Sequence, residues 1–274
     1  MTIDTYLSHL NLPDAHSHKG QNGKLLIVGG SELFHAASKW SLDVASKFVD
    51  MVFYSSVPAN NELVQQAKGE FWNGIVIPRQ EIENYMAEAD GVLIGPGMTR
   101  SSETEEITNQ LLKKYAHKKW VIDAGALQMI NPELLNQNCI VTPHQGEFER
   151  LLEKEDRLSE GSNADQGVTF SQAHFNVCLL IKGETDVVIQ GSTIELISGG
   201  NAGMTKGGTG DVLAGLVAAL YCTNDALTSA VVGSYINKKA GEELWKSVGP
   251  NFNASDLVAT IPKVLWTELN KTYR

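Results

Sequence analysis

The sequence has few cysteines, and no two of them stand at metal-binding spacing. Only Cys139, Cys178 and Cys222 occur among 274 residues, and each lies in an apolar stretch. Structural zinc sites usually contain closely spaced pairs of cysteines, so this pattern argues against one, and His16 and His18 alone are a weak metal signal. An odd number of isolated thiols predicts reduced, buried side chains, as is typical of a cytoplasmic protein.

A surplus of basic residues is also lacking. The formal net charge is −10, so the chain has no general cationic surface with which to neutralise nucleic-acid phosphates or an anionic membrane. No apolar run is long enough to span a bilayer, and the first twenty residues do not have the pattern of a signal peptide. We therefore expect a cytoplasmic protein that binds neither nucleic acid nor membrane, although a small phosphate ligand would need only local donors.

The residues that are present describe an α/β protein. Hydrophobic residues make up 42% of the chain, and many of them stand in short continuous runs that end in Gly, Pro or Ser. Such runs are typical of strands that are buried on both faces. They lie at 24–30, 51–56, 74–78, 91–97, 118–125, 139–143 and 177–183.

Helix-like segments separate several of these runs, at 102–117 and 145–155. Alternation of strands and helices predicts a large, mainly parallel sheet with helices on both faces, which is a three-layer α/β/α fold. Residues 186–190 and 193–200, joined by Gly191-Ser192, are predicted to form a hairpin at the sheet edge. Helices are expected at 211–222, 225–247 and 253–270. No linker divides the chain, so we expect one domain over residues 1–274.

Polar and small residues follow the strands at their carboxyl ends, where parallel sheets bind ligands. Gly95, Gly97, Asp123, His144 and Lys182 stand there. Each has an ordinary alternative: Asp123 could form a turn or bind magnesium or water, and His144 could be a surface residue. Glu147, in the predicted helix at 145–155, could simply be an acid of the first turn.

The stretch GGNAGMTKGGTGDVLAG, residues 199–215, has seven glycines in seventeen positions. Glycines let backbone N–H groups approach a ligand closely, and the start of the following helix adds unpaired N–H groups. Together they predict a phosphate site, although the pattern is neither a Walker A loop nor GxGxxG. We expect this site to use Lys206, Gly207, Gly208, Thr209 and Gly210.

Asp211 is an acid where a phosphate would be expected. It could face a second substrate and deprotonate a hydroxyl for phosphoryl transfer. It could equally cap the helix, since Asp is a good capping residue. The glycine cluster before it favours the functional interpretation, because a simple cap needs no such cluster.

These motifs together resemble the ADP/ATP-dependent NAD(P)H-hydrate dehydratases. The resemblance rests on SHKGQNGKLLIVGGS, IGPGM, VIDAGAL, VTPHQGEFERL, LIKGETDVVI and NAGMTKGGTGDVLAG, which occur in collinear order from about residue 17. We expect no fused epimerase domain of the kind that some members have. The resemblance implies a ribokinase-like fold and a hydro-lyase (a lyase) that repairs hydrated NADH or NADPH, the (S)-epimer. ADP or ATP would phosphorylate the ring hydroxyl, and phosphate would then leave.

The same resemblance implies residue roles and partners. Lys182, Gly183, Glu184, Thr185, Asp186 and Gly210 would contact the nucleotide. Ala36, Gly97, His144 and Asp211 would contact the hydrate, with Asp211 handling the hydroxyl proton; Gly95, Asp123 and Glu147 are further candidates for that half of the site. Magnesium would accompany the phosphates, and a homo-oligomer is expected.

Residues 31–56 depart from the family pattern, because bulky residues and Val49-Asp50 replace a small-residue helix and glycine turn. Gln145 also replaces a proline. Two alternatives follow: a small-molecule kinase of the same fold that acts on a vitamin precursor, and a nucleotide-binding protein without catalysis.

Overall fold

A single nine-stranded sheet forms the centre of the protein. The computed structural model describes residues 2–155 and 162–272, and in it the strand order is β3-β2-β1-β4-β5-β6-β7-β8-β9. The strands are β1 Lys24–Val28, β2 Met51–Ser55, β3 Ile75–Val76, β4 Gly91–Ile94, β5 Lys119–Ile122, β6 Cys139–Val141, β7 Cys178–Ile181, β8 Asp186–Gln190 and β9 Thr193–Ile197.

The first seven strands are parallel, and β8 and β9 are antiparallel to their neighbours. All seven predicted apolar runs are therefore strands, and the predicted hairpin at Gly191-Ser192 closes β8 onto β9. These predictions are confirmed. Parallel pairing places the carboxyl ends of seven strands along one edge of the sheet, which is where the candidate site residues stand.

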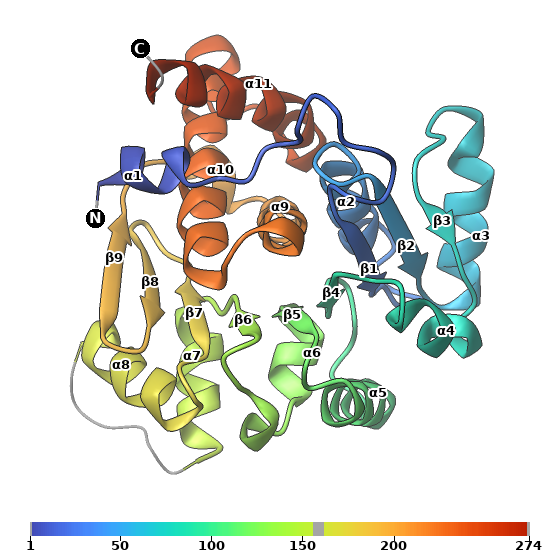
Figure 1. Cartoon of the computed structure of the whole chain (residues 1–274). Coiled ribbons are helices and arrows are strands. Elements are labelled where there is room, and N and C mark those ends of the chain that lie inside the picture. The colour runs from blue at the N-terminus through green and yellow to red at the C-terminus, as the bar shows by residue number, and fades with distance from the viewer. Residues whose placement is uncertain (1, 156–161, 273–274) are drawn as a thin grey trace.

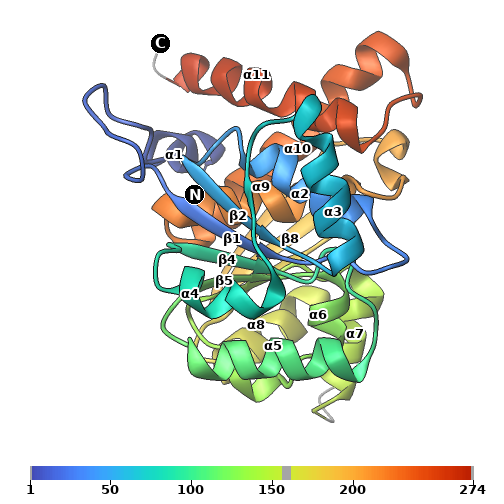
Figure 2. The same ribbon diagram turned by 90° about the vertical axis from the view of Figure 1, so that its right-hand side faces the viewer.

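Helices cover both faces of the sheet (Figures 1 and 2). One layer contains α1 Ile3–Ser8, α2 Ala36–Ala45, α9 Thr209–Thr223, α10 Ala226–Val248 and α11 Ala254–Thr272; the other contains α4 Ile82–Met86, α5 Ser102–Lys114, α6 Ala124–Met129, α7 Gln145–Glu153 and α8 Asn163–Ala173. Helix α3, Pro58–Gln66, lies beside the edge strand β3 (Figure 1). The three-layer prediction is confirmed.

Two apolar cores lie between these layers, and the strands feed them alternately. In β1, Leu25 and Ile27 belong to the core under α2, α9 and α10, while Leu26 and Val28 belong to the core over α5 and α7. Successive side chains of a strand point to opposite faces, so a strand buried on both faces must be apolar throughout. This is why the strands appear in the sequence as continuous apolar runs. Among the described residues, none of the helices is both long and apolar enough to cross a bilayer.

Candidate active site

Three neighbouring strands deliver three polar side chains to the same edge of the sheet. Asp123 follows β5, His144 follows β6 and Lys182 follows β7. The backbone N–H of Lys182 donates to the Pro143 carbonyl at 2.8 Å, and His144 and Lys182 form a parallel bridge that extends the ladder past the strands. The sheet thus fixes the spacing of these residues before any side-chain contact is made.

Lys182 and Asp123 form an ion pair at the centre of this edge. Lys182 Nζ lies 2.9 Å from Asp123 Oδ1, which also accepts a hydrogen bond from Thr142 Oγ1 at 2.7 Å. Asp123 is only 2% exposed. Burial acts to lower the pKa of Lys182, but the carboxylates of Asp123, Glu147 and Asp211 outweigh it, so the pKa is raised and the lysine stays charged.

Asp211 lies in the first turn of α9, facing this pair. Burial, and then the carboxylate of Asp123, raise the pKa of Asp211 to about 7, against the opposing effect of Lys182. A carboxyl with a pKa near 7 can accept and return a proton at neutral pH. A helix cap has no need of such a pKa, so the functional interpretation of Asp211 gains support from its surroundings.

The start of α9 is held by close packing against α2. Gly208, the N-cap residue, has φ +98°, and a Cβ there would lie 2.3 Å from Trp40 Cζ3. Ser41 Oγ donates to the Asp211 carbonyl at 2.8 Å. Residues 31–56, which depart from the family pattern, therefore contribute directly to the position of Asp211.

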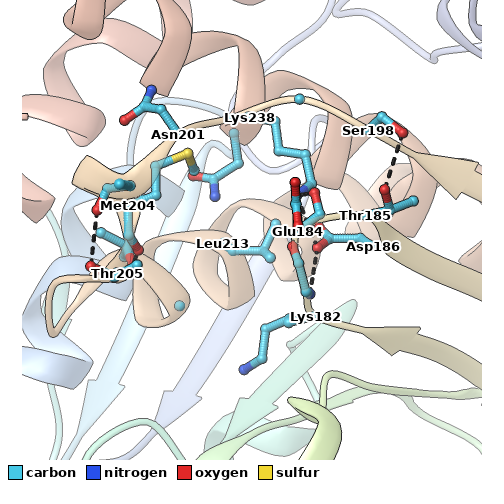
Figure 3. Close-up of a pocket in the computed structure, with 17 residues that line it drawn as sticks. Lys182, Glu184, Thr185, Asp186, Ser198, Asn201, Met204, Thr205, Leu213 and Lys238 are labelled. Atoms are coloured by element: carbon cyan, nitrogen blue, oxygen red, sulfur yellow. Dashed lines mark hydrogen bonds and ion pairs between the residues drawn. The ribbon is translucent and has the colours of Figure 1, made fainter. Parts of the chain in front are cut away.

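A cavity of about 790 Å³ opens beside the first turn of α9, which lines it with Thr209, Gly210 and Leu213 (Figure 3). Met204 and Thr205 lie at one end of it in this view, and Thr185 and Ser198, which share a hydrogen bond of 3.2 Å, lie at the other. The lining residues are 182–186, 198–202, 204–205, 209–210, 213 and 237–238. This volume suits a nucleotide-sized ligand.

Seven of the ten residues predicted to bind a nucleotide line this cavity: Lys182, Gly183, Glu184, Thr185, Asp186, Thr209 and Gly210. Asp186 shapes the loop, because its carboxylate already accepts from Gly183 N at 2.9 Å and from Ser234 Oγ at 2.7 Å.

Lys206, Gly207 and Gly208 do not line the cavity. Lys206 Nζ donates to the carbonyl oxygens of Pro250 and Phe252, the latter at 2.6 Å. That lysine therefore anchors the loop before α9 to the chain segment before α11.

Two glycines that are candidates for the hydrate half of the site, Gly95 and Gly97, stand in the loop after β4 and pack closely against neighbouring segments. A Cβ on Gly95, which has φ +120°, would lie 1.8 Å from the Asp123 carbonyl oxygen. A Cβ on Gly97 would lie 3.0 Å from Ala37 Cβ and 2.9 Å from the Phe34 carbonyl oxygen, which places Gly97 beside Ala36. The glycines thus allow the backbone of the β4 loop to approach both neighbouring segments.

His144 and Glu147 form a capping box at the start of α7. The His144 ring accepts from Glu147 N at 3.3 Å, and Glu147 Oε2 accepts from His144 N at 2.9 Å. Glu147 Oε1 accepts from Gln128 Nε2 at 2.8 Å. Glu147 is buried and both its oxygens are used, whereas more than half of the His144 side chain is exposed and available to a ligand.

Sequence reasoning missed the contribution of α10. Asn237 and Lys238 line the cavity, and Lys238 Nζ lies 3.1 Å from Asp186 Oδ1 and 2.9 Å from the Gly183 carbonyl oxygen. These residues stand in the middle of a long helix, without a glycine cluster or strand end beside them. The available signal was weak: a lysine at a position of α10 that the apolar periodicity assigns to the interior.

Comparisons with known proteins agree with this geometry. The family profile for NAD(P)H-hydrate dehydratase matches residues 25–263. An ADP-dependent (S)-NAD(P)H-hydrate dehydratase from Nitrosopumilus maritimus is 33% identical over 281 aligned residues, covering 96% of each chain. The chain spans about half the length, 51% and 54%, of two archaeal bifunctional NAD(P)H-hydrate repair enzymes that are 35% identical to it.

Solved structures give the same result for the fold. A ribokinase-like superfamily protein from Enterococcus faecalis superposes with a TM-score of 0.84 at 18% identity, covering 98% of this chain and 95% of its own. The ADP/ATP-dependent NAD(P)H-hydrate dehydratase of Bacillus subtilis, crystallised with ATP and Mg²⁺, gives 0.76 at 21% identity, covering 98% and 97%. The fold is ribokinase-like, and the chain belongs to the NAD(P)H-hydrate dehydratase family.

Proposed function

We propose that this protein is a hydro-lyase that uses ADP or ATP to dehydrate the (S)-hydrate of NADH or NADPH and so restores the nicotinamide cofactor. The observation that carries the proposal is the position of Asp211. Burial and the Asp123 carboxylate raise the pKa of Asp211 to about 7, and Asp211 stands in the first turn of α9 between Gly210 and Leu213, which line the cavity.

The nucleotide phosphates would lie at the start of α9, against the backbone N–H groups near Gly210. Lys182 Nζ is close by, since a Cβ on Gly210 would lie 3.6 Å from it. Fixed N–H dipoles and a buried cation stabilise the charge that develops on a transferring phosphoryl group. Neither has to reorganise during the reaction.

The hydrate would place its ring hydroxyl against the Asp211 carboxylate. Asp211 accepts the hydroxyl proton while the oxygen bonds to the terminal phosphorus and the nucleotide leaves one phosphate shorter. The ring C–O bond then breaks, with electrons from the ring nitrogen, and the departing group is phosphate. Loss of a proton from the neighbouring ring carbon restores the double bond. No step needs an enzyme nucleophile, and the three thiols are buried.

The residues fit magnesium that arrives with the nucleotide. In residues 2–155 and 162–272, no group of three or more His, Cys, Asp or Glu side chains could hold a metal by itself. Magnesium usually keeps several waters and uses one or two carboxylates together with substrate phosphates. The Asp123 carboxylate can supply such a ligand, which leaves Asp211 to accept the proton. When bound, magnesium would offset phosphate charge.

We also propose that the chain forms a single domain, lies in the cytoplasm and assembles into a homo-oligomer. One sheet with two cores favours a single domain. The buried, unpaired thiols favour the reducing cytoplasm. A homo-oligomer would cover exposed apolar side chains such as Leu33 and Trp72, and light scattering on the purified protein tests it.

The activity is tested by mixing purified protein with hydrated NADH, magnesium and either ADP or ATP. Recovery of the dihydronicotinamide absorbance, with release of one phosphate per cofactor, supports the proposal and identifies the donor. A stable phosphorylated product without recovery would indicate a kinase of the same fold. Nucleotide binding without turnover on the hydrate would indicate a protein that has lost catalysis.

A further inference from the structure

Nearly all polar side chains of the nucleotide cavity are already paired within the protein. Lys238 donates to the carbonyl oxygens of Gly183 at 2.9 Å and Glu184 at 3.0 Å and pairs with Asp186. Asn201 uses both ends of its amide, donating to the Gly241 carbonyl at 2.7 Å and accepting from Gly203 N at 2.9 Å. Such residues build the walls, and little hydrogen-bonding capacity remains for a ligand.

Asn237 is different. Its side chain is buried, with the residue only 4% exposed, and its Oδ1 has no hydrogen-bond partner. Among the buried, unpartnered side-chain atoms in the described part of the chain, this is the one whose residue lines the nucleotide cavity. This oxygen has almost no accessible surface in the cavity wall, and a buried carbonyl oxygen without a partner is unfavourable, so a rotation of the side chain that turns it toward a donor on the ligand would be favourable.

The surroundings of Asn237 indicate which part of a nucleotide it meets. Gly233, Asn237 and Gly241 stand four residues apart on one face of α10. A Cβ on Gly233 would lie 2.6 Å from Val217 Cγ2, and one on Gly241 would lie 2.4 Å from Met204 Sδ. Asn237 therefore faces the space between Met204 and α9, where Leu213 also lines the cavity.

Lys182, Thr209 and Gly210 occupy the part of the cavity that suits phosphate, so this apolar part, one helical turn along α9 from Thr209, suits the flat faces of a base. An asparagine amide can pair with the adenine edge in two ways at once: its oxygen accepts from the 6-amino group, and its nitrogen donates to a neighbouring ring nitrogen.

We propose that Asn237 recognises the base of the bound nucleotide and selects adenine through its 6-amino group. The inference rests on the proposed function only in requiring that a nucleotide fills this cavity. It adds a specificity-determining residue on α10 to the loop residues 182–186 and 209–210.

The test is calorimetric binding to the full chain, with magnesium and without hydrate. The ligands are ADP and purine riboside 5′-diphosphate, which lacks only the 6-amino group. We expect the wild type to prefer ADP by about tenfold, and Asn237→Ala to reduce this preference to less than twofold by weakening ADP more than its analogue. The matched control Asn201→Ala removes a paired amide from the same cavity, so it should keep the preference even if it weakens both ligands.

Equal binding of the two ligands by the wild type would overturn the inference without any variant, as would the absence of ADP binding. ADP is also compared with 2′-deoxy-ADP. If Asn237→Ala removes the preference for ADP over 2′-deoxy-ADP but keeps the preference for the 6-amino group, Asn237 binds the ribose and the inference is overturned. Because no hydrate is present, the outcome is separate from the proposed activity. If the wild type prefers ADP over its analogue but does not restore NADH from the hydrate, only the proposed dehydratase activity is contradicted. If it restores NADH but binds ADP and the analogue equally, only the role of Asn237 is contradicted.

Discussion

Replacing Asp211 by asparagine should stabilise the protein above pH 6 while it abolishes function. A carboxyl whose pKa is raised by folding binds its proton more tightly in the native state than in the unfolded state. The native state therefore loses stability as the pH rises from about 4 to about 7, the interval between the ordinary pKa of 3.8 and the value of about 7 in the folded protein. Asp211→Asn carries no ionisable group and escapes this loss.

The pKa difference sets an upper limit of about 4 kcal/mol for the gain at pH 8. The Asp211 side chain is partly exposed, so solvent screening reduces this limit. The variant also loses the favourable contact between a carboxylate and the helix N-terminus, worth less than about 1 kcal/mol. A net gain of about 2 kcal/mol should raise the melting temperature by about 5 °C.

Thermal unfolding followed by circular dichroism, without ligands, at several pH values from 4.5 to 8 measures this. The difference in melting temperature between Asp211→Asn and the wild type should be small at pH 4.5 and should grow severalfold up to pH 8. Glu88→Gln, which neutralises an exposed carboxyl after α4, is the control and should show no such growth. A pH-independent difference, or a less stable variant at pH 8, would refute the assigned surroundings of Asp211.

Three other outcomes are expected. The kcat/KM of the wild type for recovery of NADH from its hydrate should rise with pH, with a midpoint near 7, because Asp211 must be ionised to accept a proton. A kcat/KM that does not change from pH 5.5 to 8.5 would contradict that role. Lys182→Met should lower the free energy of unfolding in urea by about 3 kcal/mol, because it leaves Asp123 buried without its cation, and Lys182→Arg should recover part of this loss. Gly208→Ala should lower the melting temperature, since Gly208 has φ +98° and a Cβ there would strike Trp40. Gly207→Ala is the control: no atom lies within 4 Å of its Cβ, so it should melt within about 2 °C of the wild type. Equal decreases in melting temperature for the two variants would contradict the packing of Gly208 against Trp40.

The strands and the C-terminal helices could be predicted because their signals are local. Strands buried on both faces are continuous apolar runs, and α9 directly follows its glycine-rich cap. Helices α1, α3, α4, α6 and α8 were not predicted. In α8, Gly167 interrupts the helical pattern, and its reason is tertiary: a Cβ there would lie 2.3 Å from Ile189 Cδ1 on β8.

The candidate site divides in the same way. Asp123, His144 and Lys182 could be found because each follows a predicted strand, and parallel strands end at one edge. Asn237 and Lys238 could not, because they reach the cavity only through the packing of α10 against β8 and η4 Ala202–Thr205. Lys206 shows the opposite case: its place in the glycine motif predicted a phosphate ligand, but its ammonium is bound to the carbonyl oxygens of Pro250 and Phe252.

The central claim is that nucleotide and hydrate meet at Asp211, and one comparison tests it most directly. Wild type and Asp211→Asn are assayed for recovery of NADH from its hydrate with ADP or ATP and magnesium, and nucleotide affinity is measured on the same samples. The account predicts that the variant loses turnover by about a hundredfold or more, while its nucleotide dissociation constant changes less than about threefold, the size of a small electrostatic effect. Turnover by Asp211→Asn at a rate close to that of the wild type would contradict it.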